Sequence, residues 1–150
     1  MASEDRQFAI SIDINAPVDR VYEVMSEVER WPEWTPSVTS IKRLDSGPFV
    51  VGSRAVIRQP MFPPALWTVT AIDGHRSFTW SNRGPGIKVI AHHSIDANGD
   101  HSKATLSLQY EGFLGGLLAR LTRGITNRYL AMEAKGLKAR SENPFFLVSS

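Results

Sequence analysis

The first 36 residues constrain the fold of this chain more than any other segment. Residues 8–14 alternate apolar and polar side chains, which predicts a strand with one buried face. Asn15 is then a candidate helix cap, and Pro17 suits the first helical turn, where its missing N–H would lack a partner anyway. The helix is predicted from an apolar stripe at helical spacing, namely Val18, Val21, Tyr22, Met25 and Val28. An aromatic, proline-containing turn over 31–36 ends it.

The middle of the chain is predicted to contain strands separated by turns. Asp73-Gly74-His75-Arg76 and the segment 96–100 have the composition of hairpin loops. Gly84-Pro85-Gly86 begins like a dinucleotide-binding fingerprint, but no third glycine and no helix follow, so it predicts a turn. Strands this close together, with no helix between them, must pair antiparallel. The predicted strands are 38–44, 53–59, 66–72, 78–82, 87–95 and 104–110.

After Gly112 the apolar period becomes helical and predicts one long C-terminal helix. Leu130 and Leu137 lie off its apolar seam, which leaves open a contact of the helix with the core on a second side late in its course. Asn143-Pro144 ends the helical order, and the apolar tail 145–148 is either docked or free. The seam consists of Leu114, Leu118, Leu121, Ile125, Tyr129, Met132 and Gly136. The cations Arg120, Arg123, Lys135, Lys138 and Arg140 are predicted to form the solvated face of this helix.

Composition bounds the class of protein. A chain of 150 residues fits one domain, 1–150, with a single core. The formal charge of +2 gives no argument for nucleic acid, and the absence of cysteine excludes disulfides and thiolate metal sites. No apolar run approaches the roughly 20 residues of a membrane helix, and the short acidic N-terminus is unlike a signal peptide. We therefore expect a cytoplasmic protein with no stable membrane insertion.

These elements in this order resemble the START-like (SRPBCC) superfamily. Within it, the polyketide cyclase/dehydrase and lipid-transport family is the nearest match, over Phe8 to about Arg140. The resemblance implies an α+β helix-grip fold, in which a seven-stranded antiparallel sheet curls around the long helix, with two short helices over 17–28 and 31–35. Relatives range from cyclases to carriers and receptors, so the fold alone does not determine the chemistry. The matching segments are Ile14-Asn15-Ala16-Pro17 with Val21-Tyr22, Trp31-Pro32-Glu33-Trp34, Gly52-Ser53-Arg54-Ala55, Phe78-Thr79-Trp80, His93, Gly99 and Thr105-Leu106.

Two adjacent histidines suggest a metal pair, but their geometry argues against it. Neighbours in a strand point to opposite faces, so His92 and His93 cannot chelate one ion, and we predict no metal site and no cofactor. His93 shares its face with Ala91 and Ile95, which places it on the apolar side, while His92 is predicted to be exposed. A core-edge histidine satisfied by one hydrogen bond explains His93 more simply than a catalytic role does.

A pocket is expected where the resemblance brings aromatic segments together. Core packing explains any one ring, but four rings around one cavity favour contact with a ligand. Pro36 is predicted to border the mouth, Arg58 to orient a ligand carbonyl if it points inward, and Leu121 and Ile125 to line the pocket from the helix. Trp67 is the ambiguous ring, because its strand is apolar on both faces. The four rings are Trp34, Trp67, Trp80 and Tyr110.

Two principal functions are consistent with the sequence. The first is binding or carrying a small hydrophobic molecule, such as a lipid, an isoprenoid or a polyketide-like compound. The alternative is a polyketide cyclase or dehydratase that uses His93 as general acid or base, assisted by Tyr110 or Arg58. No complete catalytic constellation is present in the sequence, so the enzyme hypothesis depends on His93 facing the pocket beside a polar partner. A weaker third hypothesis is a regulatory partner protein that uses the loop 60–64 or the tail as a contact. Monomer and homodimer are both compatible with the sequence.

Overall fold

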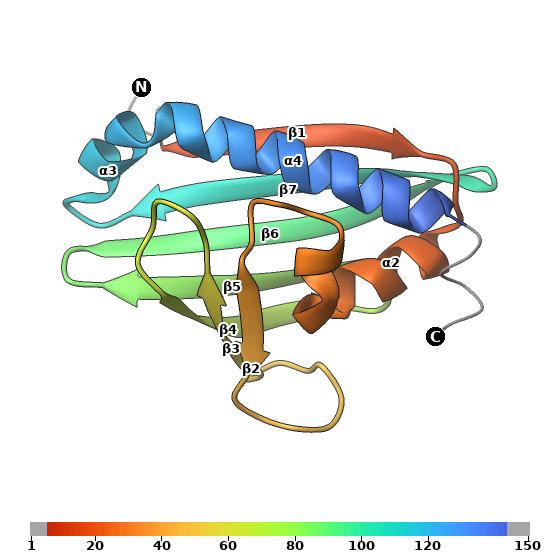
Figure 1. Cartoon of the computed structure of the whole chain (residues 1–150), viewed down its shortest axis with the longest axis horizontal. Helices are drawn as coiled ribbons and strands as arrows, with labels where there is room; N and C mark the ends of the chain where they lie inside the picture. Colours follow the sequence, from red (N-terminus) through yellow and green to blue (C-terminus); the bar gives the residue numbers. More distant parts are fainter. Residues whose placement is uncertain (1–5, 144–150) are drawn as a thin grey trace.

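The computed structural model describes residues 6–143, and the seven strands found there form one antiparallel sheet (Figure 1). The predicted helix-grip architecture is confirmed: the sheet curls and α4 crosses its inner side. The strand order is β1-β7-β6-β5-β4-β3-β2, so the first strand pairs with the last and the remaining strands follow as hairpins. The strands are β1 (Gln7–Ile14), β2 (Ser40–Arg43), β3 (Arg54–Arg58), β4 (Ala65–Asp73), β5 (Ser77–Gly84), β6 (Ile87–Asn98) and β7 (His101–Glu111).

Two short helices follow β1, as predicted, but the cap differs from the expectation. They are α2 (Val18–Ser26) and the 3-10 helix η1 (Val28–Glu33). The N-cap is Pro17, whose carbonyl accepts hydrogen bonds from the N–H groups of Arg20 and Val21 at 3.1 and 3.2 Å. Asn15 lies too far upstream to cap the helix, and its N–H donates instead to Oε2 of Glu142 at 2.7 Å. The Asn15 cap was therefore a wrong prediction.

The C-terminal helix is interrupted at Thr122 and buries a different face from the predicted one. It consists of α3 (Gly115–Leu121) and α4 (Arg123–Glu142). Leu130 and Leu137, placed beside the seam by the sequence, are buried, whereas Leu121 is 73% exposed. The predicted seam lies one residue off the buried line, which runs through Ala119 of α3 and Thr126 and Leu130 of α4. The buried face of α4 consists of Thr126, Leu130, Ala134, Leu137, Arg140 and Ser141.

An ionic cluster of two buried arginines and two exposed glutamates joins α2, η1 and α4. Arg140, predicted to be solvated, is buried and donates to Oε1 of Glu33 at 2.6 Å. Arg20, also buried, donates to the carbonyl of Arg140 at 3.2 Å and to Oε1 of Glu23 at 2.7 Å. The hydrogen bond from Arg140 holds the pKa of the Glu33 carboxyl below its usual value. These contacts fix the aromatic turn after α2 against the C-terminal helix.

We expect Gly136→Ala to destabilise the protein, although alanine is normally the better helix former. A Cβ at this position would lie 1.9 Å from the carbonyl oxygen of Trp34, a backbone atom that cannot rotate away. Alanine otherwise favours a helix over glycine by about 0.5–1 kcal/mol, and the clash should reverse that gain into a loss of about 1–3 kcal/mol. Gly124→Ala is the matched control in the same helix, because its Cβ would meet nothing within 4 Å. Urea unfolding that shows both variants stabilised would contradict this contact.

None of the helices within residues 6–143 has the length and apolarity that crossing a membrane requires. The tail 145–148, for which docked and free states were both open, lies outside the described residues.

Candidate ligand-binding site

A cavity of about 440 Å³ lies between the inner face of the sheet and α4. Its walls come from η1, from strands β3 to β7 and from α3 and α4, and it is partly covered by the segment Gln59–Pro64, which we call the strap. The volume falls within the range of about 300–1,000 Å³ typical of small-molecule sites. Most of the lining is apolar, and among the described residues its permanently charged side chains are Arg83 and Glu133. The site therefore suits a small molecule with little net charge.

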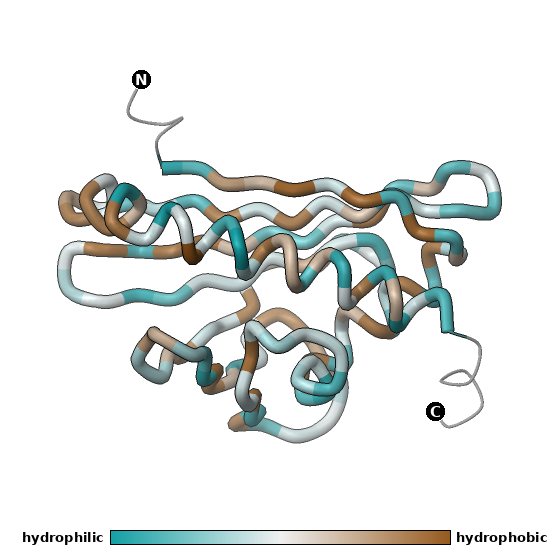
Figure 2. The backbone as a smooth tube through the Cα atoms, turned by 45° about the horizontal axis from the view of Figure 1, so that its top comes forward, coloured by the Kyte–Doolittle hydropathy of each residue, from teal (hydrophilic) through white to brown (hydrophobic). Residues whose placement is uncertain are grey.

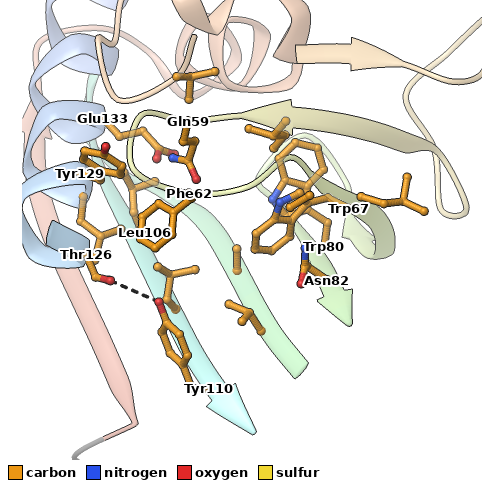
Figure 3. Close-up of a pocket in the computed structure, with 18 of the residues that line it drawn as sticks. Gln59, Phe62, Trp67, Trp80, Asn82, Leu106, Tyr110, Thr126, Tyr129 and Glu133 are labelled. Atoms are coloured by element: carbon orange, nitrogen blue, oxygen red, sulfur yellow. Dashed lines mark hydrogen bonds between the residues drawn. The ribbon is translucent and has the colours of Figure 1, made fainter. Parts of the chain in front are cut away.

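Aromatic rings form the wall on the sheet side. Trp80 of β5 lies centrally, with its ring centre 5.8 Å from that of Trp67 on β4 and 5.6 Å from that of Trp31 on η1. Side chains on alternate positions of a strand share a face, and pairing of adjacent strands brings their inward rings together. Figure 3 shows Trp67 and Trp80 across the cavity from the side chains of α4, with Phe62 of the strap between them.

His93 and Glu133 form a buried polar pair at one side of the aromatic wall. The His93 ring is only 4% exposed and stacks on Phe78 with a centroid distance of 4.3 Å and an interplanar angle of 10°. Its Nε2 lies 3.5 Å from Oε1 of Glu133 on α4. Both residues line the cavity. A carboxylate beside an imidazole can orient the ring and stabilise its protonated form, which is the arrangement that acid–base chemistry requires.

Two polar atoms of lining residues are buried without a hydrogen-bond partner in the part of the chain that the structure describes. They are Nε1 of Trp67 and Nδ1 of His93. Buried polar groups in proteins are nearly always paired, because an unpaired one costs about 1–3 kcal/mol. The indole N–H can only donate, so it fits an acceptor oxygen. The imidazole nitrogen can donate or accept according to its protonation state.

Hydroxyl groups occupy the opposite part of the cavity. The hydroxyl of Tyr110 on β7 lies 3.2 Å from Oγ1 of Thr126 (Figure 3). Oγ1 of Thr126 in turn lies 3.3 Å from Oγ1 of Thr122. These hydrogen bonds satisfy the Tyr110 and Thr126 hydroxyls within the protein. The cavity is therefore polar at two separated places, with apolar and aromatic surface between them.

The strap closes part of the cavity by contacts at two points. Tyr129 of α4 donates its hydroxyl proton to the carbonyl of Pro60, and its ring packs edge-on against Phe62 with centres 5.9 Å apart. At the start of the strap, Nε2 of Gln59 donates to the carbonyl of Ser37 at 3.1 Å. Ligand entry past the strap would require these contacts to break.

The structure brings together some of the residues predicted for the pocket and separates others. Trp67, Trp80, His93 and Tyr110 line the cavity. The other five lie outside its lining: Trp34, Pro36, Arg58, Leu121 and Ile125.

Each of these five has a different environment from the one predicted. Trp34 is half-buried against Trp31 and α4, whereas Pro36 and Arg58 are exposed. Leu121 is exposed, and Ile125 lies one position before the buried residue Thr126 of α4. Of the aromatic turn 31–36, Trp31 lines the cavity, whereas Trp34 and Pro36 do not.

The sequence analysis expected the C-terminal helix to line the pocket but named the wrong residues, Leu121 and Ile125. Thr126, Tyr129, Leu130 and Glu133 recur at spacings of three and four residues, which places them on one helix face. Their helical spacing is visible in the sequence. Three of these four side chains carry polar groups, however, so they are not found when only apolar residues at helical spacing are considered. Only Tyr129 belonged to the predicted seam.

The two adjacent histidines point to opposite faces, as expected. His92 is exposed, and its Nδ1 lies 2.6 Å from Oγ1 of Thr79. Partial burial, together with the neighbouring His93, lowers the pKa of His92 below its ordinary value. Within residues 6–143, no three His, Cys, Asp or Glu side chains gather as a metal site would require.

Several solved structures share this architecture. A protein from Thermus thermophilus has a TM-score of 0.73 at 19% identity, covering 96% of this chain and 99% of the other. The Zhui aromatase/cyclase from Streptomyces sp. R1128 has a TM-score of 0.74 at 14% identity, covering 91% and 93% of the two chains. A START superfamily protein from Mycobacterium smegmatis has a TM-score of 0.71 at 17% identity, covering 90% and 98%. At these identities the likeness concerns the fold.

A search of curated protein sequences found no match. The sequence pattern of the family described as "Polyketide cyclase / dehydrase and lipid transport" matches residues 5–142, which is nearly the whole chain. The helix-grip sheet, the position of the cavity and this match agree with one another. The chain therefore belongs to the polyketide cyclase/dehydrase and lipid-transport family.

Proposed function

We propose that the protein binds a small, flat, mostly apolar molecule in the cavity beneath the strap. The observation that carries this proposal is the aromatic wall of Trp31, Trp67 and Trp80 beside two buried polar atoms that have no partner among the described residues. Flat rings pack well on such a wall, and aromatic side chains supply much of the binding energy of small-molecule sites.

The polar atoms narrow the class of ligand within that proposal. Nε1 of Trp67 fits a carbonyl or hydroxyl oxygen, because it can only donate. A second oxygen or hydroxyl would reach His93. The opposite charges of Arg83 and Glu133 in the lining favour a molecule with little net charge. A polyketide-like ring or an isoprenoid quinone head has this chemistry, whereas a saturated acyl chain leaves both polar atoms unpaired.

Filling the cavity should abolish binding of a flat apolar probe. Ala91 of β6 is buried and lines the cavity, so Ala91→Phe would place a ring where the ligand lies. We expect the affinity for the fluorescent probe N-phenyl-1-naphthylamine to fall by at least about tenfold, which corresponds to roughly 1.4 kcal/mol of lost binding energy. Fluorescence titration measures this, and thermal melting verifies that the variant is folded.

Ala71→Phe is the matched control, because Ala71 is exposed on β4, which is separated from β6 by β5. The control should bind the probe as the unaltered protein does. Equal binding by both variants would place the probe elsewhere and remove the support for this cavity. Native mass spectrometry of protein purified from its own host would identify an endogenous ligand. An empty protein that also fails to bind any flat apolar probe would contradict the proposal.

A second candidate function is an enzyme of the cyclase or dehydratase type. The specific observation in its favour is the buried contact of 3.5 Å between His93 and Glu133 at the cavity wall. Removing a proton from a carbon between two carbonyl groups requires a positioned base, and the unpaired Nδ1 of His93 is a suitable one. The structural neighbours named as aromatase/cyclases share the fold, which is compatible with this chemistry.

A further inference from the structure

One end of the molecule exposes an unusual concentration of large apolar side chains. Phe113 is 84% exposed, and Leu114, Leu117 and Leu121 on the same segment are also exposed. The opposite side of α3 is apolar as well, since Ala119 is buried and Leu118 lines the cavity. A short helix that is apolar on both sides has one face unpartnered. We call the four exposed residues the apolar tip; Figure 2 shows α3 mostly in brown at this end.

The apolar tip lies beside the opening of the cavity. The exposed lining residues Pro63, Pro64, Leu66 and Arg83 show where the cavity reaches the surface. Leu118 connects this opening to α3, and Met61, which is 85% exposed, extends the apolar surface onto the strap. An apolar surface thus runs from the tip to the edge of the binding site.

Cations surround the apolar tip almost without acids. Among residue 6, the β5–β6 turn 83–88 and the segment 111–123, there are five cations and one acid, Glu111. Within α3 itself the only charged residue is Arg120. Among the described residues at this end, cations therefore outnumber acids. The five cations are Arg6, Arg83, Lys88, Arg120 and Arg123.

We propose that the apolar tip docks on anionic membrane surfaces and presents the opening of the cavity to the lipid. Exposed apolar side chains can enter the boundary between headgroups and acyl chains, while long basic side chains keep their charged groups at the headgroups. An apolar ligand could then pass between membrane and cavity without crossing water. The four residues of the apolar tip do not line the cavity, whereas the passage of a ligand from the membrane rests on the proposed function.

The charges around the apolar tip favour an anionic membrane over a second copy of the chain as the surface that covers it. A two-fold symmetric dimer would place the same patch against itself, and five cations would then face five cations. Such a contact brings like charges together at a cost, whereas anionic lipids supply the complementary charge. The basic rim therefore favours a membrane over self-association.

Vesicle co-sedimentation tests the proposal with the unaltered protein. We expect binding to vesicles of phosphatidylcholine mixed with phosphatidylglycerol, weaker binding to phosphatidylcholine alone, and loss of binding at high salt. The double variant Leu117→Ser/Leu121→Ser should lower the partition coefficient by at least about tenfold. Arg120→Gln should lower it by about fivefold, the expected effect of one surface cation.

Two matched controls separate the tip from the rest of the surface. Val50→Ser/Val51→Ser removes two exposed apolar side chains from the β2–β3 loop, away from α3 in Figure 1, and should leave partitioning unchanged. Arg76→Gln removes a cation at the opposite end of the sheet, in the β4–β5 turn, and should change little. The proposal is overturned by any of three results: no binding to anionic vesicles, equal losses in controls and tip variants, or light scattering that shows a dimer which the tip variant dissociates.

Discussion

Leu137→Ala should lower the free energy of unfolding by about 2–5 kcal/mol, whereas Leu121→Ala should change it by no more than about 0.5 kcal/mol. Leu137 is 1% exposed and belongs to the face of α4 that packs on α2 and the sheet. Removing its side chain leaves a cavity that the neighbouring elements cannot easily fill. Leu121 is also a leucine in the C-terminal helical region, but its side chain is exposed to solvent.

The comparison is internally controlled because both changes delete the same atoms from a leucine. Urea denaturation at neutral pH gives both free energies of unfolding, and equal slopes would show that the denatured states are comparable. A loss of several kcal/mol for Leu121→Ala, with little effect of Leu137→Ala, would restore the seam predicted from the sequence. It would also contradict the break between α3 and α4.

The same pair of leucines shows which part of the fold could be predicted. Strands were located from alternation, because a period of two changes little with local irregularities. For the C-terminal helix, the predicted seam lies one residue N-terminal to the buried line in both segments, and a shift of one residue rotates the predicted face by about 100°. The buried face of α4 also includes Thr126 and Ser141, whose burial depends on tertiary partners rather than on hydrophobicity.

In the candidate site, too, some residues could be predicted from the sequence and others could not. The rings of β5 and β7 followed from the family resemblance, whereas the ring of Trp67 on β4 stayed ambiguous because its strand is apolar on both faces. Glu133 was not predicted, because a lone acid on a helix is normally solvated. Its position depends on how α4 rotates over the sheet, and that rotation is set by close packing such as the contact of Gly136 with Trp34. Helix rotation thus determines the polar part of the site, while strand register determines the aromatic part.

If the protein is a cyclase, His93→Gln should slow conversion of a linear tetraketide thioester to its aromatic product by about 10²–10⁴-fold. Glutamine has comparable polarity but cannot accept and release a proton near neutral pH. Glu133→Gln keeps the shape of the neighbour and removes its charge, so we expect a smaller loss from poorer stabilisation of the protonated ring. Product formation is followed by absorbance and mass spectrometry.

His92→Gln is the control for this experiment, since His92 occupies the adjacent position of β6 but points to the outer face of the sheet. It should retain the full rate. All three variants should still bind N-phenyl-1-naphthylamine, because none removes the aromatic wall. Loss of turnover with retained binding would identify His93 as the acid–base group. An unchanged rate in His93→Gln, or no turnover above buffer in the unaltered protein, would leave the cavity as a binding site, and the His93–Glu133 pair would then serve to orient a ligand rather than to transform it.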